Sequence, residues 1–214
     1  MSIFPVFISM ASGLLLVSLF FWSMWVLLMA FILFVFCLVV YLYDMVEIYF
    51  SYESGFWLFV TSEAIIFGTL IFCCLYFDLG FYESLSSALE LPFLGCFLLL
   101  GSSITVTGFH HILGWRWAWV ALLLTVLLGS MFVVLQVLEM NEAFMSILDS
   151  SFYACSFCTV GLHFSHVILG IIGLVIVLVV GVPSLGVYRC SVITWYWHFV
   201  DYIWLFVYTF VYVC

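Results

Sequence analysis

Residues 152–181 read FYACSFCTVGLHFSHVILGIIGLVIVLVVG, and this stretch decides the class of fold. It contains no Asp, Glu, Lys or Arg. An α-helix needs about 20 predominantly apolar residues to cross the hydrocarbon core of a bilayer. The stretch is longer than that, so it predicts a transmembrane helix.

The composition of the whole chain points the same way. Of the 214 residues, 69% are hydrophobic and only 6% are charged, and the mean hydropathy is +1.45. Such a chain can bury its apolar surface only in a bilayer, where the backbone must hydrogen-bond to itself. The apolar runs are continuous and do not alternate in segments of about ten residues, as in a β-barrel. We therefore predict an all-α polytopic membrane protein, with one membrane domain over residues 1–214.

Apolar runs of bilayer length predict seven transmembrane helices. They fall at roughly residues 5–22, 24–43, 55–77, 92–113, 117–138, 152–181 and 193–213. The first two are joined almost directly, which predicts a tight antiparallel hairpin. Acidic and turn-forming residues mark the predicted loops: Asp44, Glu47, Glu139, Glu142, Asp149, Pro183 and Gly186.

The two arginines give the predicted orientation. Arg116 and Arg189 are the only basic Lys or Arg residues, and both fall in loops on the side that also holds the N-terminus. The positive-inside rule places that side in the matrix or cytoplasm. Seven spans then place the C-terminus on the opposite side.

Charge and residue usage bear on partners and origin. The formal net charge of −9, with no lysine, leaves nothing to neutralise phosphates, so nucleic acid is excluded as a partner. Residues with T- and G-rich codons, such as Phe and Trp, are abundant, which suggests a mitochondrial gene. The N-terminus also lacks the positive region of a cleavable signal.

Two cysteines form a CxxC pattern, Cys155 and Cys158, at the start of the sixth apolar run. A redox or metal role requires a thiolate in a positive or polar environment. Since these surroundings are apolar, we favour small apolar packing residues, with the redox or metal role as the alternative.

Ionisable groups inside the spans each need a reason, because they cost roughly 2.5–3.5 kcal/mol at the bilayer centre. At about 1.5 Å per residue, Glu63 lies about 12 Å from the arginine side. The same arithmetic predicts one polar layer in that half of the bundle. The candidate residues are Glu63, His110, His111, His163, His166, His198 and Asp201.

Several roles are open to this layer. Haem ligation is weakened because His163 and His166 share one helix. A copper or zinc site from Glu63, His163 and His166 is conceivable, and a proton relay is a further alternative. We favour groups that satisfy each other, hydrogen-bond between helices and line a polar cleft.

Two features refine this prediction. His198 and Asp201 are one turn apart, so we expect a structural clamp in which they pair with each other or with the sixth span. Small residues, Gly161, Ser165, Gly170 and Gly173, predict close helix packing along the sixth span, with a hinge as the alternative.

Five motifs occur in order along residues 44–206: TSEAIIF at 61–67, SITVTGFHH at 103–111, LQVLEMNEA at 135–143, GLHFSHVILG at 161–170 and YWHFVD at 196–201. In sequence and order they resemble the subunit III family of cytochrome c oxidase.

The resemblance implies a non-catalytic core subunit of respiratory complex IV in the mitochondrial inner membrane, with its N-terminus in the matrix and its C-terminus in the intermembrane space. It implies no haem or copper on this chain, since haem a and copper belong to partner subunits. Subunit I would be the main contact, beside other complex IV subunits. Helices 1–2 would be splayed from helices 3–7 around bound phospholipids. Support of assembly, stability and proton uptake is implied. The competing class is a stand-alone multi-pass transporter.

The resemblance also implies roles for particular residues. Glu63, His163, His166, His198 and Asp201 occupy motif positions, and the first three would line the cleft and the face toward subunit I. The chain departs from the family at Tyr43 and Val192, where many members have an arginine and a glutamate. Either lipid headgroups are not bound at those positions, or Arg116 and Arg189 replace the missing partners.

Overall fold

The computed structural model describes residues 4–21, 23–47, 53–78 and 85–213. Regular structure in these ranges is helical, which confirms the all-α prediction. The chain divides into two compact units, Met1–Tyr52 and Glu53–Cys214, and each is described by itself. The elements are α1 (Phe4–Phe21), α2 (Met24–Glu47), α3 (Glu53–Phe77), α4 (Leu91–His111), α5 (Ala118–Glu142), α6 (Ser151–Val180), α7 (Val182–Leu185), α8 (Val187–Val207) and the π-helix η1 (Tyr208–Val213).

The first unit is the predicted helical hairpin. α1 and α2 pack along each other, and the backbone N–H of Ser23 donates to the carbonyl of Ser18 at 3.2 Å across the turn. Ala11 and Ala30 are fully buried, since small side chains let two helices approach closely. Much of the apolar surface outside this contact is exposed, as suits a helix pair in lipid.

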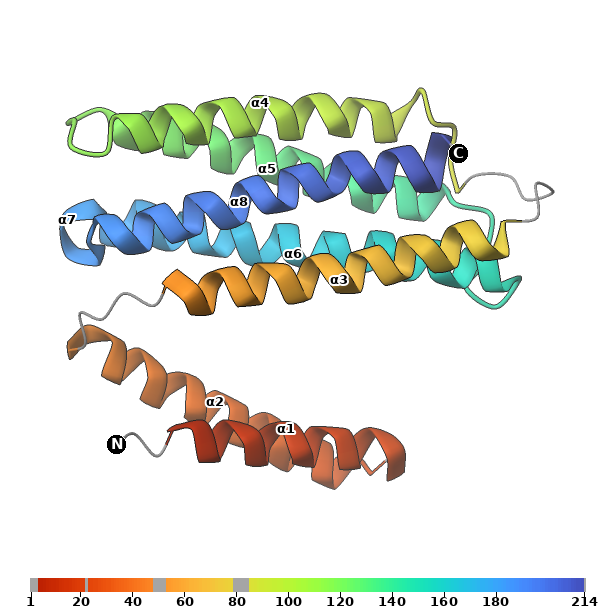
Figure 1. Cartoon of the computed structure of the whole chain (residues 1–214), viewed down its shortest axis with the longest axis horizontal. Coiled ribbons are helices and arrows are strands. Elements are labelled where there is room, and N and C mark those ends of the chain that lie inside the picture. The colour runs from red at the N-terminus through yellow and green to blue at the C-terminus, as the bar shows by residue number, and fades with distance from the viewer. Residues whose placement is uncertain (1–3, 22, 48–52, 79–84, 214) are drawn as a thin grey trace. The chain divides into compact units, whose positions relative to one another are not determined.

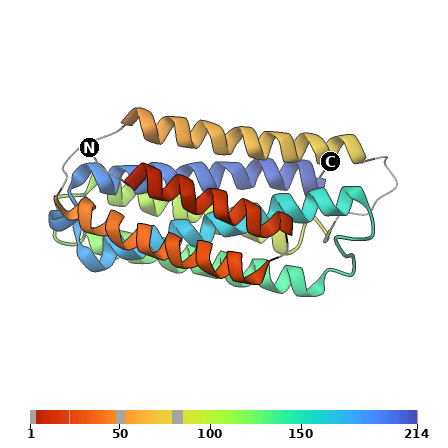
Figure 2. The same cartoon turned by 90° about the horizontal axis from the view of Figure 1, so that it is seen from below.

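The second unit is a bundle whose helices run side by side (Figure 1). α4 packs on α5 and α3 packs on α6, while α8 contacts α3, α4 and α6. Figure 2 shows α3 on one side of α8. The largest buried side chains of α8 are Trp197 and Trp204. α8 therefore lies at the centre of this bundle and supplies its largest buried side chains.

Helix ends follow the local sequence. The side chain of Ser150 caps α6 by accepting a hydrogen bond from the backbone N–H of Tyr153 at 3.2 Å. α7 is a single turn between Gly181 and Gly186, which have φ angles of 82° and 83°. Glycine tolerates this positive-φ region because it has no Cβ. The chain can thus reverse between α6 and α8.

Among the described residues, four helices are long and apolar enough to cross a membrane: α3, α4, α5 and α6. Together with the helical fold they confirm a polytopic membrane protein. The count of seven spans, the single domain and the splayed first two helices stay predictions.

Six residues of the predicted loops are helical: Asp44, Glu47, Glu139, Glu142, Pro183 and Arg189. α5 continues to Glu142, so Glu139 lies within a helix and is buried. Arg189 lies in the first turn of α8, and Pro183 lies in α7. α2 continues to Glu47, while residues 48–52 of the predicted loop lie outside the described residues. The boundaries differ because polar residues near a helix end can find partners in the bundle, which local polarity does not reveal.

Candidate functional site

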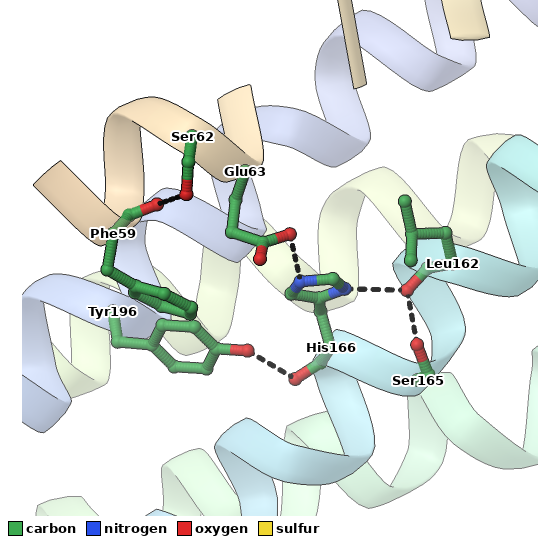
Figure 3. A network of polar contacts seen from close by, with 7 residues as sticks. All are labelled: Phe59, Ser62, Glu63, Leu162, Ser165, His166 and Tyr196. Atoms are coloured by element: carbon green, nitrogen blue, oxygen red, sulfur yellow. Dashed lines mark hydrogen bonds and ion pairs between the residues drawn. The ribbon is translucent and has the colours of Figure 1, made fainter. Parts of the chain in front are cut away.

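Glu63 of α3 and His166 of α6 form an ion pair across the helix interface (Figure 3). His166 Nε2 lies 3.0 Å from Glu63 Oε2, and the side chains are 9% and 18% exposed, respectively. The sequence placed both residues in one polar layer, and the structure brings them into contact. The pair joins the TSEA and GLHFSH motifs directly.

The second nitrogen of His166 limits where protons can sit. Nδ1 lies 2.8 Å from the backbone carbonyl of Leu162, which can only accept, so Nδ1 carries a proton. One further proton lies between Nε2 and the Glu63 carboxyl. The pair is therefore either neutral imidazole with carboxylic acid or imidazolium with carboxylate, and its net charge is zero in both cases.

Aromatic side chains fix the orientation of the His166 ring. The Tyr196 hydroxyl of α8 donates to the His166 backbone carbonyl at 3.4 Å, and this group points toward His166 in Figure 3. The Phe67 ring meets the imidazole edge to face at 5.4 Å, and the Phe59 ring stacks on Tyr196 at 6.2 Å. α3, α6 and α8 thus all contribute to the pair.

His163 belongs to the apolar core and does not contact Glu63. Its ring is fully buried and packs against Trp204 at 4.9 Å and Phe132 at 5.7 Å. Its Nε2 donates to the backbone carbonyl of Val200 at 3.2 Å. Among the described residues, Nδ1 has no hydrogen-bond partner. His163 therefore joins α6 to α8.

His198 takes its partners from α4. Thr107 Oγ1 donates to the Ser103 carbonyl at 2.8 Å, so it accepts from His198 Nε2, which is 3.3 Å away. Ser103 Oγ then donates to His198 Nδ1 at 2.8 Å. Two hydroxyls thus satisfy a neutral imidazole.

Asp201 also faces α4. The residue is 2% exposed, and Oδ1 lies 3.5 Å from Ser102 Oγ, which also donates to the Leu99 carbonyl at 2.7 Å. Ser102 Oγ in turn accepts from the Trp197 indole N–H at 3.0 Å. Within the described residues, Asp201 Oδ2 has no partner.

The expected pairing of His198 and Asp201 with each other or with α6 is therefore wrong. Both side chains face hydroxyls of α4, because Ser102, Ser103 and Thr107 lie on the side of α4 that contacts α8. The clamp stays a prediction, now between α8 and α4.

The remaining candidates lie near helix ends. His110 Nε2 is 3.2 Å from Ser191 Oγ, which links α4 to α8. His111 and Arg116 are exposed, and Arg189 is half-buried. His110 therefore contacts α8 and not the Glu63–His166 pair.

Sequence reasoning missed one buried acidic group. Glu139 is 4% exposed, and it accepts from Ser86 Oγ at 2.9 Å and from Gln136 Nε2 at 2.8 Å. The available signal was the LQVLE segment, where the only glutamine of the chain precedes a glutamate by three residues. That spacing puts both side chains on one helix face.

Over the described part of the chain, His, Cys, Asp and Glu side chains form no group of three or more that could hold a metal ion. Glu63, His163 and His166 do not come together as the alternative copper or zinc site would require. His163 contacts the Val200 carbonyl, whereas His166 contacts Glu63.

Comparisons with known proteins agree with the resemblance. The family model for cytochrome c oxidase subunit III matches residues 1–214. Cytochrome c oxidase subunit 3 of Coturnix japonica is 37% identical over 172 residues, which are 72% of this chain and 66% of the relative. That of Loxodonta africana is 34% identical over 180 residues, 76% of this chain and 69% of the relative. That of Heterololigo bleekeri is 31% identical over 188 residues, 79% of this chain and 73% of the relative.

The match to the first of these relatives spans just under two thirds of its length, at 66%. The family model nevertheless covers every residue here, including the segments that carry Glu63 and His166. The chain belongs to the cytochrome c oxidase subunit III family.

Proposed function

We propose that this chain is a non-catalytic core subunit of cytochrome c oxidase, complex IV, in the mitochondrial inner membrane. Subunit I is its main contact, other complex IV subunits are further partners, and haem a and copper belong to those partners. The N-terminus lies in the matrix and the C-terminus in the intermembrane space. The family match over the whole chain supports this proposal.

Its role is to support assembly, stability and proton uptake of the catalytic subunit. The observation that carries the proton-uptake role is the Glu63–His166 pair. The pair holds one shared proton at zero net charge, so it avoids the cost of an unpaired ion inside an apolar bundle. Since Glu63 is 18% exposed, the proton is accessible from outside the α3–α6 interface.

Bound phospholipid is the second part of the proposal. Arg116 and Arg189 are the only Lys or Arg residues of the chain, and both lie on the proposed matrix side. A guanidinium matches a phosphate group in geometry and charge. These two residues are therefore the proposed headgroup contacts.

Purification tests membership of the complex. The chain is extracted gently from its native membrane, and its partners and optical spectrum are recorded. We expect co-purification with a haem a and copper enzyme, and no chromophore on this chain after separation. A chain that purifies alone would favour a transporter, and one that keeps haem would favour a cytochrome.

The variant Glu63→Gln tests the proton-uptake role. The amide keeps the size of the carboxyl and can donate to His166 Nε2, but it cannot release the shared proton. We expect normal assembly and slower turnover, most strongly at alkaline pH, where protons are scarce. The measurement is oxygen consumption and proton uptake of the purified complex.

A matched control lies on the same helix. Glu53 is exposed in the first turn of α3, so Glu53→Gln removes a carboxylate without touching the pair. Equal slowing in both variants, or unchanged turnover in Glu63→Gln, would contradict the role given to the pair.

A further inference from the structure

Four cysteines from two helices lie at one end of the α3–α6 pair. Cys73 and Cys74 come about one turn before α3 ends at Phe77. Cys155 and Cys158 come about one to two turns after α6 begins at Ser151. Because α3 packs against α6, the CxxC pattern faces a second pair of thiols that the sequence did not connect to it.

Direct contacts hold these two segments together. Cys74 Sγ lies 3.7 Å from Thr159 Oγ1 and 3.9 Å from Ser156 Oγ. Cys73 precedes Cys74, and Cys155 precedes Ser156. The contacts of Cys74 therefore bring residues 73 and 155 to the same α3–α6 interface. The neighbouring thiols thus come from opposite sides of the helix interface.

Exposure separates the reactive thiols from the structural one. Cys74 is fully buried beneath two hydroxyl groups, so a solution oxidant cannot reach it. Cys73 and Cys155 are half-buried and Cys158 is exposed. Among the described residues these thiols do not form a group that could hold a metal ion.

We propose that Cys73 and Cys155 are a redox-sensitive thiol pair that forms a disulfide between α3 and α6. The oxidant is a hydroperoxide, represented by hydrogen peroxide. Cys155 rests as a thiol; after loss of its proton to water, the sulfur attacks one peroxide oxygen, the O–O bond breaks, and sulfenic acid forms. The departing hydroxide takes up that proton and leaves as water. The Cys73 thiol then attacks the Cys155 sulfur, the S–O bond breaks, and the proton of Cys73 leaves with the departing oxygen as water. In total, two thiols and one hydrogen peroxide give one disulfide and two waters.

The disulfide would act on the interface that holds Glu63 and His166. Residues 63 and 73 are about 15 Å apart along α3. A covalent link between α3 and α6 restricts sliding and separation of the two helices. Oxidation would thus hold the polar pair in contact, and reduction would restore the freedom of the interface.

Mass spectrometry of the protein in its native membrane tests the proposal without mutagenesis. Membranes are treated with hydrogen peroxide or with dithiothreitol, free thiols are blocked with N-ethylmaleimide, and the protein is digested with pepsin. We expect a peptide containing Cys73 linked to one containing Cys155, with a mass lower than their sum by two hydrogens. It should appear after peroxide, disappear after dithiothreitol, and account for equal losses of both free thiols. Fragmentation between Cys73 and Cys74 assigns the bond.

Cys96 and Cys190 are internal controls, because both are buried and lie outside α3 and α6; their state should not change. Full alkylation of Cys73 and Cys155 after peroxide would overturn the proposal, as would a bond from Cys155 to Cys74 or Cys158. The proposal would also be overturned if Cys73 and Cys155 were found neither linked to each other nor alkylated. A second test compares Cys73→Ser with Cys190→Ser, and only the first should lose the linked peptide.

Discussion

The contact between Trp197 and two glycines gives the sharpest test of the packing. Trp197 is 0% exposed. A Cβ built at Gly170 of α6 would lie 2.8 Å from Trp197 Cε3 and 2.9 Å from Cζ3, and one at Gly129 of α5 would lie 2.7 Å from Cη2. The perturbation is Gly170→Ala, which places one methyl group into this contact.

The ring has little room to move away. Gly129 lies against its far edge, and its N–H donates to Ser102. Overpacking a core costs about 1–3 kcal/mol, and loss of the indole hydrogen bond costs about 1 kcal/mol. Replacing glycine by alanine within a helix stabilises the helix by about 1 kcal/mol. The expected net loss in the free energy of unfolding is therefore about 1–3 kcal/mol.

The assay is thermal unfolding of the purified protein in mild detergent, followed by circular dichroism. For a chain of this length, Tm falls by roughly 2–4 °C per kcal/mol, so Gly170→Ala should lower it by roughly 2–12 °C. The control is Gly161→Ala on the same helix, where a Cβ would meet nothing within 4 Å. Gly161→Ala should leave Tm unchanged or slightly raised.

A Gly170→Ala protein as stable as the wild type would refute the reasoning, and so would equal losses in both variants. The first result would mean that α6 and α8 adjust freely around Trp197. The second would mean that glycine itself, and not the close approach, matters at both positions.

Three further changes have defined outcomes. Ser150→Ala removes the cap that accepts from Tyr153 and should destabilise the protein by about 1 kcal/mol, measured as a lower Tm; an unchanged Tm would exclude a role for the cap. Glu139→Ala removes the acceptor of the buried Gln136 amide and of the half-buried Ser86 hydroxyl and should cost about 1–3 kcal/mol, whereas Glu139→Gln should cost less; equal losses would contradict this. Asp201→Leu removes the group that faces Ser102 and should lower the amount of assembled complex, measured by native gel, far more than electron transfer per complex. Normal assembly with only proton uptake slowed would refute the clamp.

The fold class could be predicted from the sequence because it depends on one-dimensional quantities. Length of apolar run, absence of charge and continuous apolarity suffice for a helical membrane protein. Helix boundaries were less accessible: Glu139 looked like a loop residue and is a buried helix residue. Its burial depends on Ser86, which is 53 positions away in the chain.

The polar layer was predictable as a set but not as pairs. Helical rise places Glu63, His166 and His198 at similar depth, since depth depends only on position in a span. Which residue faces which depends on the rotation of each helix about its axis. Because of the rotation of each helix in the bundle, His166 faces Glu63, His163 faces the Val200 carbonyl and His198 faces hydroxyls of α4.

The sequence by itself thus determined the membrane class, the family and the candidate residues, because each follows from local composition or from motifs in order. The tertiary structure alone decided the partners: the contact of Glu63 with His166, the turn of Asp201 toward α4, and the contact of Cys74 with Thr159. These contacts join residues far apart in the chain, and they form only when helix packing fixes which faces of neighbouring helices meet.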